Sequence, residues 1–136
     1  MKFRNKTGGF TVVELLVVIV VIAILVALTL PNLFGLQRRA RDDTRKNDLK
    51  NLQQALETFY NDSNRYPSAL TGLTSTYINA VPKDPKTDTD YTYTPAPAGC
   101  NDTGTNCTSY TLAATLENTS DPAAVGGVYT ITSVNQ

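Results

Sequence analysis

The chain has 136 residues, of which 41% are hydrophobic and 18% are charged, so it can form one domain with an additional segment. Twelve basic and twelve acidic residues give a formal net charge of zero at pH 7. The sequence contains no histidine, which excludes Ser/His and Cys/His nucleophile pairs and histidine-containing zinc sites. We therefore expect no enzymatic activity.

The first element in chain order is a long apolar run. Every residue from Leu15 to Leu28 is Leu, Val, Ile or Ala, and the basic residues Lys2, Arg4 and Lys6 precede the run. Taken from Phe10 to Leu30, it would form a helix of ~31 Å, which is enough to cross the ~30 Å hydrocarbon layer of a bilayer. We predict a membrane-spanning helix over residues 10–30.

A secretory signal peptide is the competing interpretation of this start. It requires small residues in an A-x-A arrangement after the apolar run, but Pro31 and Asn32 follow instead. The small residues Gly8 and Gly9 stand before the run, so a cut after Gly9 would remove a leader of residues 1–9 and keep the helix. The product would carry nine basic and twelve acidic residues, a net charge of −3, and we expect no strong general nucleic-acid binding.

One carboxylate, Glu14, stands just inside the apolar run. Thr11 and Glu14 fit the T-x-x-E capping box that opens many helices, which would make Glu14 a helix cap. A cut after Gly9 would instead place a new amine on Phe10, one turn away, and an acid-amine pair could form within a chain or between neighbouring chains. An unpaired intramembrane carboxylate would then favour lateral association with a chain that offers an amine.

Residues 31–62 continue as an amphipathic helix. Leu49, Leu52, Leu56 and Phe59 recur at three- and four-residue steps among polar residues, which indicates one buried stripe. Pro31 removes a backbone donor and Gly35 is a second weak point one turn later. We expect helix softening there, either as a bend or as a stretch that unwinds when subunits pack together.

Residues 63–136 read as a β-rich globular head. Turn chemistry at residues 61–64 ends the helix, a short helix is expected over Ala69–Thr76, and residues 81–90 form a loop. Alternating apolar residues then predict strands around Tyr91 and Tyr93, from Tyr110 to Leu116, and around Tyr129 and Ile131. The predicted class is α+β, with a three- to four-stranded antiparallel sheet packed on the leucine stripe of the long helix.

Two groups of side chains in the head could bind or crosslink. Cys100 and Cys107 enclose six residues, a spacing that does not suit zinc, and they could close a tight disulfide or remain free thiols. Asp84, Asp88 and Asp90 are weak calcium candidates, because the D-x-D-x-D-G pattern is missing; the alternative is a hydrated charged loop. We predict no other cofactor.

The stretch GGFTVVELLVVIVVIAILVALTLP resembles the processed N-terminus of type IV pilins and type II secretion pseudopilins. The basic leader, Gly9 before the cut, Phe10 as new first residue, Glu14 as its fifth residue and Pro31 all match. YNDSNRYP, VPKDP and YTLAATLEN are similar to the body of such subunits.

This resemblance implies a prepilin peptidase that cuts after Gly9 and N-methylation of Phe10. It also implies a filament of identical subunits in which Glu14 neutralises the Phe10 amine of a neighbour. A platform protein and an assembly ATPase would draw the subunit from the inner membrane. The precursor would be a single-pass membrane protein with an extracytoplasmic head, and the product an extracellular or periplasmic filament.

The first functional hypothesis is a pilus subunit for attachment, twitching motility or DNA uptake, because the calcium-loop pattern typical of secretion pseudopilins is not evident near the C-terminus. The alternative is the major pseudopilin of a type II secretion system. A third hypothesis, from a different class, is an uncleaved single-span anchor that carries a binding module. In a filament, the basic residues after the apolar run could meet acids of neighbouring subunits: Arg38, Arg39, Arg41, Arg45, Lys46 and Lys50.

Overall fold

The structure is a computed structural model that describes residues 9–135, without the side chains of residues 29–34. The chain forms two compact units, Met1–Gln37 and Arg38–Gln136, which we call the N-terminal unit and the head. Of the predicted leader, residues 1–8 lie outside the described residues.

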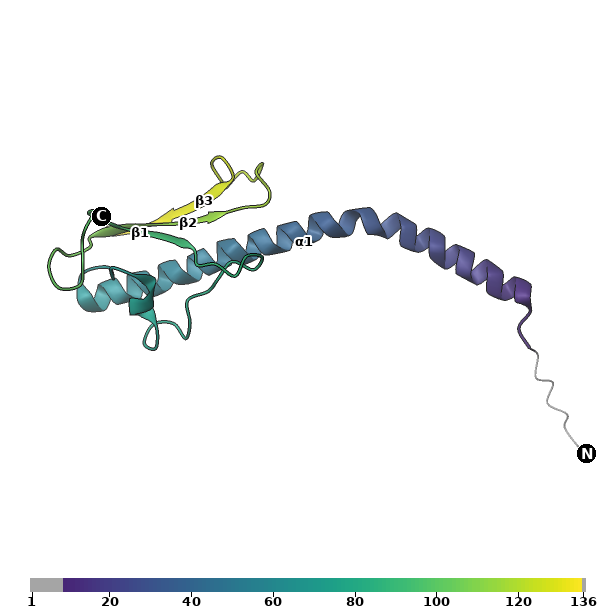
Figure 1. Ribbon diagram of the computed structural model, residues 1–136, viewed down its shortest axis with the longest axis horizontal. Helices are drawn as coiled ribbons and strands as arrows, with labels where there is room; N and C mark the ends of the chain where they lie inside the picture. Colours follow the sequence, from purple (N-terminus) through teal and green to yellow (C-terminus); the bar gives the residue numbers. More distant parts are fainter. Residues whose placement is uncertain (1–8, 136) are drawn as a thin grey trace, which may run out of the picture. The chain divides into compact units, whose positions relative to one another are not determined.

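The described elements confirm the α+β class and give three strands (Figure 1). The long helix α1 contributes to both units, and the other elements belong to the head. In chain order they are helix α1 (Val12–Ser63), 3-10 helix η1 (Leu70–Leu73) and strands β1 (Thr92–Ala96), β2 (Ser109–Thr115) and β3 (Val128–Thr132).

The C-terminal end of α1 has a local cause. Asn64 adopts a left-handed conformation with φ of 52°, and its amide donates to the carbonyl oxygen of Tyr60 at 2.7 Å. This single bond is the αL termination, in which asparagine is one of the residues that tolerate positive φ. Pro67 then disfavours helical geometry at Tyr66, whose amide donates to the carbonyl of Cys107 at 2.8 Å. The predicted end of the helix is confirmed.

The sheet is antiparallel, with strand order β1-β2-β3. Leu112 at the centre of β2 lies opposite Tyr93 of β1 and Ile131 of β3. Alternate residues of β2, namely Tyr110, Leu112 and Ala114, are buried, as the two-residue period predicts.

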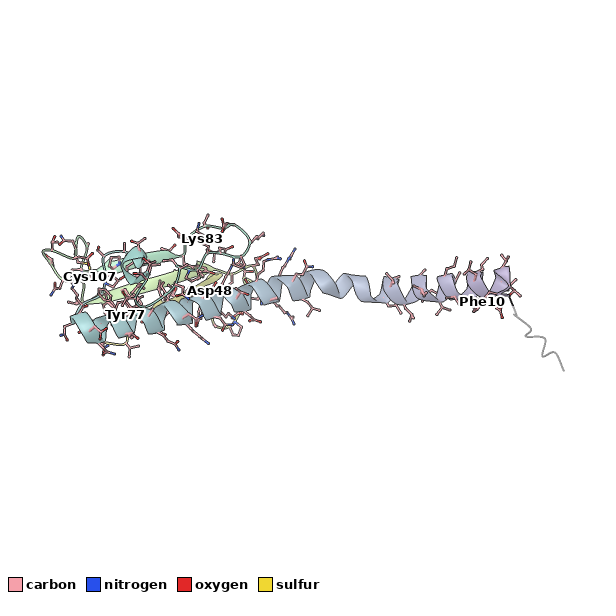
Figure 2. All side chains as sticks on the ribbon, turned by 90° about the horizontal axis from the view of Figure 1, so that it is seen from below. Phe10, Asp48, Tyr77, Lys83 and Cys107 are labelled. Carbon is pink, nitrogen blue, oxygen red and sulfur yellow. A yellow bond between two sulfur atoms is a disulfide. The ribbon has the colours of Figure 1, made fainter. Side chains whose placement is uncertain are left out.

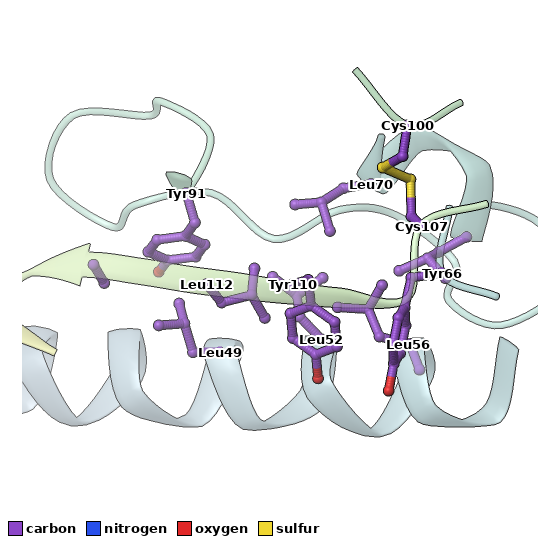
Figure 3. Close-up of a cluster of buried hydrophobic side chains, with 13 residues drawn as sticks. Leu49, Leu52, Leu56, Tyr66, Leu70, Tyr91, Cys100, Cys107, Tyr110 and Leu112 are labelled. Atoms are coloured by element: carbon purple, nitrogen blue, oxygen red, sulfur yellow. A yellow bond between two sulfur atoms is a disulfide. The ribbon is translucent and has the colours of Figure 1, made fainter. Parts of the chain in front are cut away.

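The core of the head lies between β2 and the stripe of α1 (Figure 3). Leu49, Leu52 and Leu56 are each 0% exposed, and Phe59 packs against the margin of the same cluster. Each fully buried leucine contributes about 1.5–3 kcal/mol relative to an exposed one. The predicted packing of the sheet on this stripe is therefore confirmed.

The segment between α1 and β1 closes one side of this core. Leu70 and Leu73 of η1 are both buried, as expected, but the helix is shorter than the predicted Ala69–Thr76. It stops because Thr74 turns to an extended conformation and donates its amide to Thr71. The predicted loop at residues 81–90 follows.

Candidate functional site

The start of α1 carries the capping box expected from T-x-x-E. The Glu14 amide donates to the Thr11 hydroxyl oxygen at 3.2 Å, and the Glu14 carboxylate accepts from the Thr11 amide at 2.8 Å. The Thr11 hydroxyl also lies 2.8 Å from the same carboxylate. Phe10, just before the cap, is 89% exposed and is labelled in Figure 2. In a single chain, the side chain of Glu14 therefore serves its own helix end.

The N-terminal unit leaves large apolar side chains exposed from Phe10 to Leu28, with the most covered, Val20 and Val26, still 48% exposed. Exposed apolar area of this extent indicates a surface made to be covered by lipid or protein. Among the residues that the structure describes, no helix meets the combined length and apolarity required of a membrane span.

The two positions at which the helix was predicted to soften both lie inside α1. α1 continues through Pro31 and Gly35, and a Cβ placed on Gly35 would meet nothing within 4 Å. The side chain of Pro31 lies outside the described residues. Softening of the helix at these two positions stays a prediction.

A cluster of charged residues, which we call the Arg45 cluster, joins α1 to two loops of the head. The Arg45 guanidinium donates to Asp42 at 2.7 Å, to Asp84 at 2.6 Å and to Glu117 at 3.1 Å. The side chains of Arg45 and Asp42 are each only 3% exposed. Arg41 adds a bidentate pair with Glu117, at 2.6 and 2.8 Å. Such fork geometry is the strongest arrangement for an arginine-carboxylate pair.

The electrostatics of the cluster follow from these bonds. Hydrogen bonding from Arg45 lowers the pKa of Asp84 well below its usual range, and hydrogen bonding from Arg41 does the same for the pKa of Glu117. The bond to Asp84 raises the pKa of Arg45 against the opposing effect of burial. All three groups are therefore charged at neutral pH.

Lys46 forms a further ion pair beside this cluster, with Asp121 in the connection between β2 and β3. Thus Arg41, Arg45 and Lys46 bind acids of their own chain. For these three residues, the expectation that they would meet acids of neighbouring subunits gains no support from the structure. Apart from Asp42, their partners are 39 to 76 residues away along the chain, so the sequence did not reveal them.

The calcium candidates are not brought together as a site. Asp84 is bound to Arg45 and also accepts the amides of Lys86 and Thr87, whereas Asp88 and Asp90 are exposed. Among the described residues, no group of three potential ligand side chains could hold a metal ion. Calcium binding at these aspartates gains no geometric support.

The predicted disulfide is present. Cys100 and Cys107 are bonded in the connection between β1 and β2, with Cα atoms 5.1 Å apart. Next to it, Asp102 accepts the amide and the hydroxyl of Ser68, and the carbonyl of Asp102 accepts from Arg65. The crosslinked loop is thus attached to the chain that follows α1.

A second feature that sequence reasoning missed is the carboxylate of Glu57. It accepts the hydroxyls of Tyr66 and Tyr110, the amide of Val134 and the side-chain amide of Asn135, at 2.8 to 3.2 Å. Burial, together with the bond to Glu57, raises the pKa of Tyr66 to about 12. Glu57 follows the buried Leu56 in the helix. This position beside the buried stripe was the feature of the sequence that could have pointed to a role for Glu57 in the head.

The described fold, a long helix with an exposed apolar start and a small antiparallel sheet on its second half, defines the pilin class of filament subunits. Two family models match in tandem: the prokaryotic N-terminal methylation motif over residues 4–30, and type II secretion system (T2SS), protein G over residues 32–106. The second covers more than half of the chain. The chain therefore belongs to the type II secretion protein G family.

Individual relatives agree with this assignment. The type II secretion system core protein G of Vibrio cholerae is 32% identical over 109 residues, which are 68% of this chain and 74% of the relative. Its counterpart from Aeromonas hydrophila is 32% identical over 99 residues, or 60% and 69% of the two chains. The type IV major pilin protein PilA of Myxococcus xanthus is 35% identical over 65 residues, which are 48% of this chain and 30% of the relative. No solved structure matches significantly.

These comparisons confirm the pilin and pseudopilin resemblance and change the order of the two functional hypotheses. The secretion alternative fits better than the pilus subunit, because the protein G family model extends past the N-terminal segment to residue 106, over the second half of α1 and the first part of the head. The absence of a calcium-loop pattern was therefore a poor guide to the branch of the family. None of the three relatives described above carries the name of an enzyme.

Proposed function

We propose that this protein is the major structural subunit of a type II secretion pseudopilus, a filament of identical subunits. The tandem match of the methylation motif and the protein G family carries the proposal. The exposed apolar side chains from Phe10 to Leu28 support it, because a filament built around these helices would cover them. The subunit has no catalytic role in this proposal.

Processing comes first in the proposed sequence of events. A prepilin peptidase cuts after Gly9, and the new amine on Phe10 is methylated. The segment 10–30 holds the precursor in the inner membrane with the head outside, where the disulfide between Cys100 and Cys107 is stable. A platform protein and an assembly ATPase then move the subunit into a periplasmic filament.

Glu14 changes partner in this proposal. Before assembly its carboxylate is held by Thr11 of its own chain. In the filament it pairs with the charged Phe10 amine of a neighbour, and the cost of an intramembrane carboxylate without a counter-charge favours this exchange. Softening at Pro31 and Gly35 would let α1 adapt to its neighbours.

The first experiment is the intact mass, with N-terminal fragmentation, of this protein from membranes and from sheared surface material of the cells that produce it. A start at methylated Phe10 in the membrane fraction, with little protein in the sheared fraction, supports the secretion subunit. A start at methylated Phe10 in abundant surface fibres supports the pilus subunit instead, the function that the similarity to PilA favours. An uncut start at Met1 contradicts both and supports a plain membrane anchor.

A variant separates assembly from anchoring. We expect Glu14→Gln to reduce filament formation at least tenfold, because it keeps the size of the side chain and removes its charge. Asp43→Asn, at an exposed acid of the head, is the matched control and should assemble normally. Crosslinking of neighbouring subunits in membranes measures assembly, and equal crosslinking of Glu14→Gln and wild type would contradict the proposed role.

A further inference from the structure

Three carboxylates from three segments of the head meet at one buried guanidinium. Asp42 comes from α1, Asp84 from the loop before β1, and Glu117 from the turn after β2. Nε and Nη2 of Arg45 contact Asp84 at 2.6 and 3.1 Å, while Nη1 contacts Asp42 at 2.7 Å and Glu117 at 3.1 Å. Arg45 is therefore a residue of α1 that contacts both loops at once.

The other bonds of these carboxylates are also made within the chain. Asp42 accepts the backbone amides of Glu117 and Asn118 at 2.8 and 2.9 Å. Asp84 accepts two amides of its own loop, those of Lys86 and Thr87. Glu117 is held by Arg41 and by the Lys86 ammonium.

The carboxylate oxygens that a metal ion would need as ligands already accept hydrogen bonds from this chain. A calcium ion takes six to eight oxygen ligands at 2.3–2.6 Å, and it would have to displace the guanidinium from the carboxylates that meet here. Without Arg45, Asp42 and Asp84 would have no bonded cation, and a buried unpaired charge is costly. The donor set of this junction fits an internal cation and does not fit calcium.

We propose that Arg45 is the built-in cation of the head, and that it holds the two loops on α1 in the way that a bound divalent ion could. The sequence suggested calcium among the aspartates of the 81–90 loop; the geometry assigns that role to an arginine of α1. The inference concerns folding of the head, so it stands whether or not the chain polymerises.

The first test uses the wild-type full chain in detergent. All seven tyrosines lie between residues 60 and 129, so their near-ultraviolet circular dichroism reports unfolding of the head. We expect the same Tm in excess chelator and in millimolar calcium. A Tm that falls by several degrees in chelator, or rises by several degrees with calcium, would overturn the proposal.

The second test asks whether Arg45 acts through its charge. Arg45→Met keeps a long side chain without the charge, and Lys50→Met at an exposed lysine of α1 is the matched control. We expect Arg45→Met to lower the Tm at pH 7 while Lys50→Met leaves it nearly unchanged. The difference from wild type should become smaller as the pH falls from 4 to 2.5, because the carboxylates then take up protons and depend less on a cation.

Wild type and Arg45→Met share the other charged or titratable groups around residue 45, so the difference in Tm between them does not include the titration that these groups have in common. The groups are Arg41, Lys86, Asp90 and Tyr91. A difference in Tm that does not depend on pH would mean that Arg45 acts only by packing, and would overturn the proposal. If Arg45→Met does not fold, Arg45→Met with Asp84→Asn removes one negative charge as well. Recovery of folding in this double variant supports the charge role. Arg45→Lys keeps the positive charge, so if neither it nor the double variant folds, the charge role is contradicted.

Discussion

Apolar side chains from Phe10 to Leu28 are 48–89% exposed in the N-terminal unit, whereas Leu49, Leu52 and Leu56 of the head are 0% exposed. Apart from Phe10, both sets belong to the same helix, α1. In the head, moreover, even charged groups such as Arg45 find partners within the chain. The head thus contains the interactions that stabilise it, whereas the N-terminal unit exposes apolar side chains that other molecules can contact. A substitution should therefore change either folding or association, depending on its unit.

The largest expected effect on folding is at the centre of the core. Leu52→Ala removes a fully buried side chain between α1 and β2 and should lower the free energy of unfolding of the head by about 2–5 kcal/mol. Tyrosine circular dichroism during denaturant unfolding of the full chain measures it. Val20→Ala, a comparable truncation in the N-terminal unit, is the control and should leave head unfolding unchanged. If Val20→Ala destabilised the head as much as Leu52→Ala does, the two units would not differ in their contribution to folding of the head.

The same contrast explains what could be predicted from the sequence. The leucine stripe and the alternation of β2 are periodic over a few residues, so they were predictable, as was the capping box of Thr11 and Glu14. The Arg45 cluster was missed because Asp84 and Glu117 are 39 and 72 residues away from Arg45. One signal existed: Arg41 and Arg45 continue the four-residue spacing that leads to Leu49, so they lie on the buried face of α1.

A second substitution addresses the crosslinked loop of the head. Replacing Cys100 and Cys107 together by serine should lower the free energy of unfolding of the head by roughly 2–3 kcal/mol, because the closed loop no longer restricts the unfolded chain. Denaturant unfolding of the full chain measures the change. Reductant should destabilise wild type and have no effect on the double variant. A response of the double variant to reductant would show that the effect has another source.

Acid should weaken the head through the carboxylates of the Arg45 cluster. The pKa values of Asp84 and Glu117 are lowered by arginine, so their contribution to stability is complete above the ordinary carboxyl pKa of about 4 and is lost as pH falls further. We expect the Tm of the head to fall by several degrees between pH 4 and pH 2.

Glu117→Gln should lower the Tm at pH 7 and make this acid dependence shallower, since one of the titrating groups is gone. Asp43→Asn, at an exposed acid, is the control and should keep the wild-type slope. An unchanged slope in Glu117→Gln would mean that other carboxylates cause the loss, and would weaken the view of the head as held by its own ion pairs.

The smallest effect is expected at the start of α1, where one threonine can separate two roles of Glu14. Thr11→Val keeps the shape of the side chain and removes the hydroxyl that accepts the Glu14 amide. Loss of such a cap costs about 1 kcal/mol of local helix stability. Hydrogen exchange at the first amides of α1 measures this loss, while the Tm of the head should stay the same.

Filament assembly decides between the two roles. If Glu14 acts in assembly through its charge, Thr11→Val keeps that charge and should assemble within about fivefold of wild type, since 1 kcal/mol changes an equilibrium by a factor of about five. Glu14→Gln should fail under the same conditions. If Thr11→Val instead loses assembly to the same extent as Glu14→Gln, the helix cap is the shared cause, and the carboxylate need not meet the amine of a neighbouring chain.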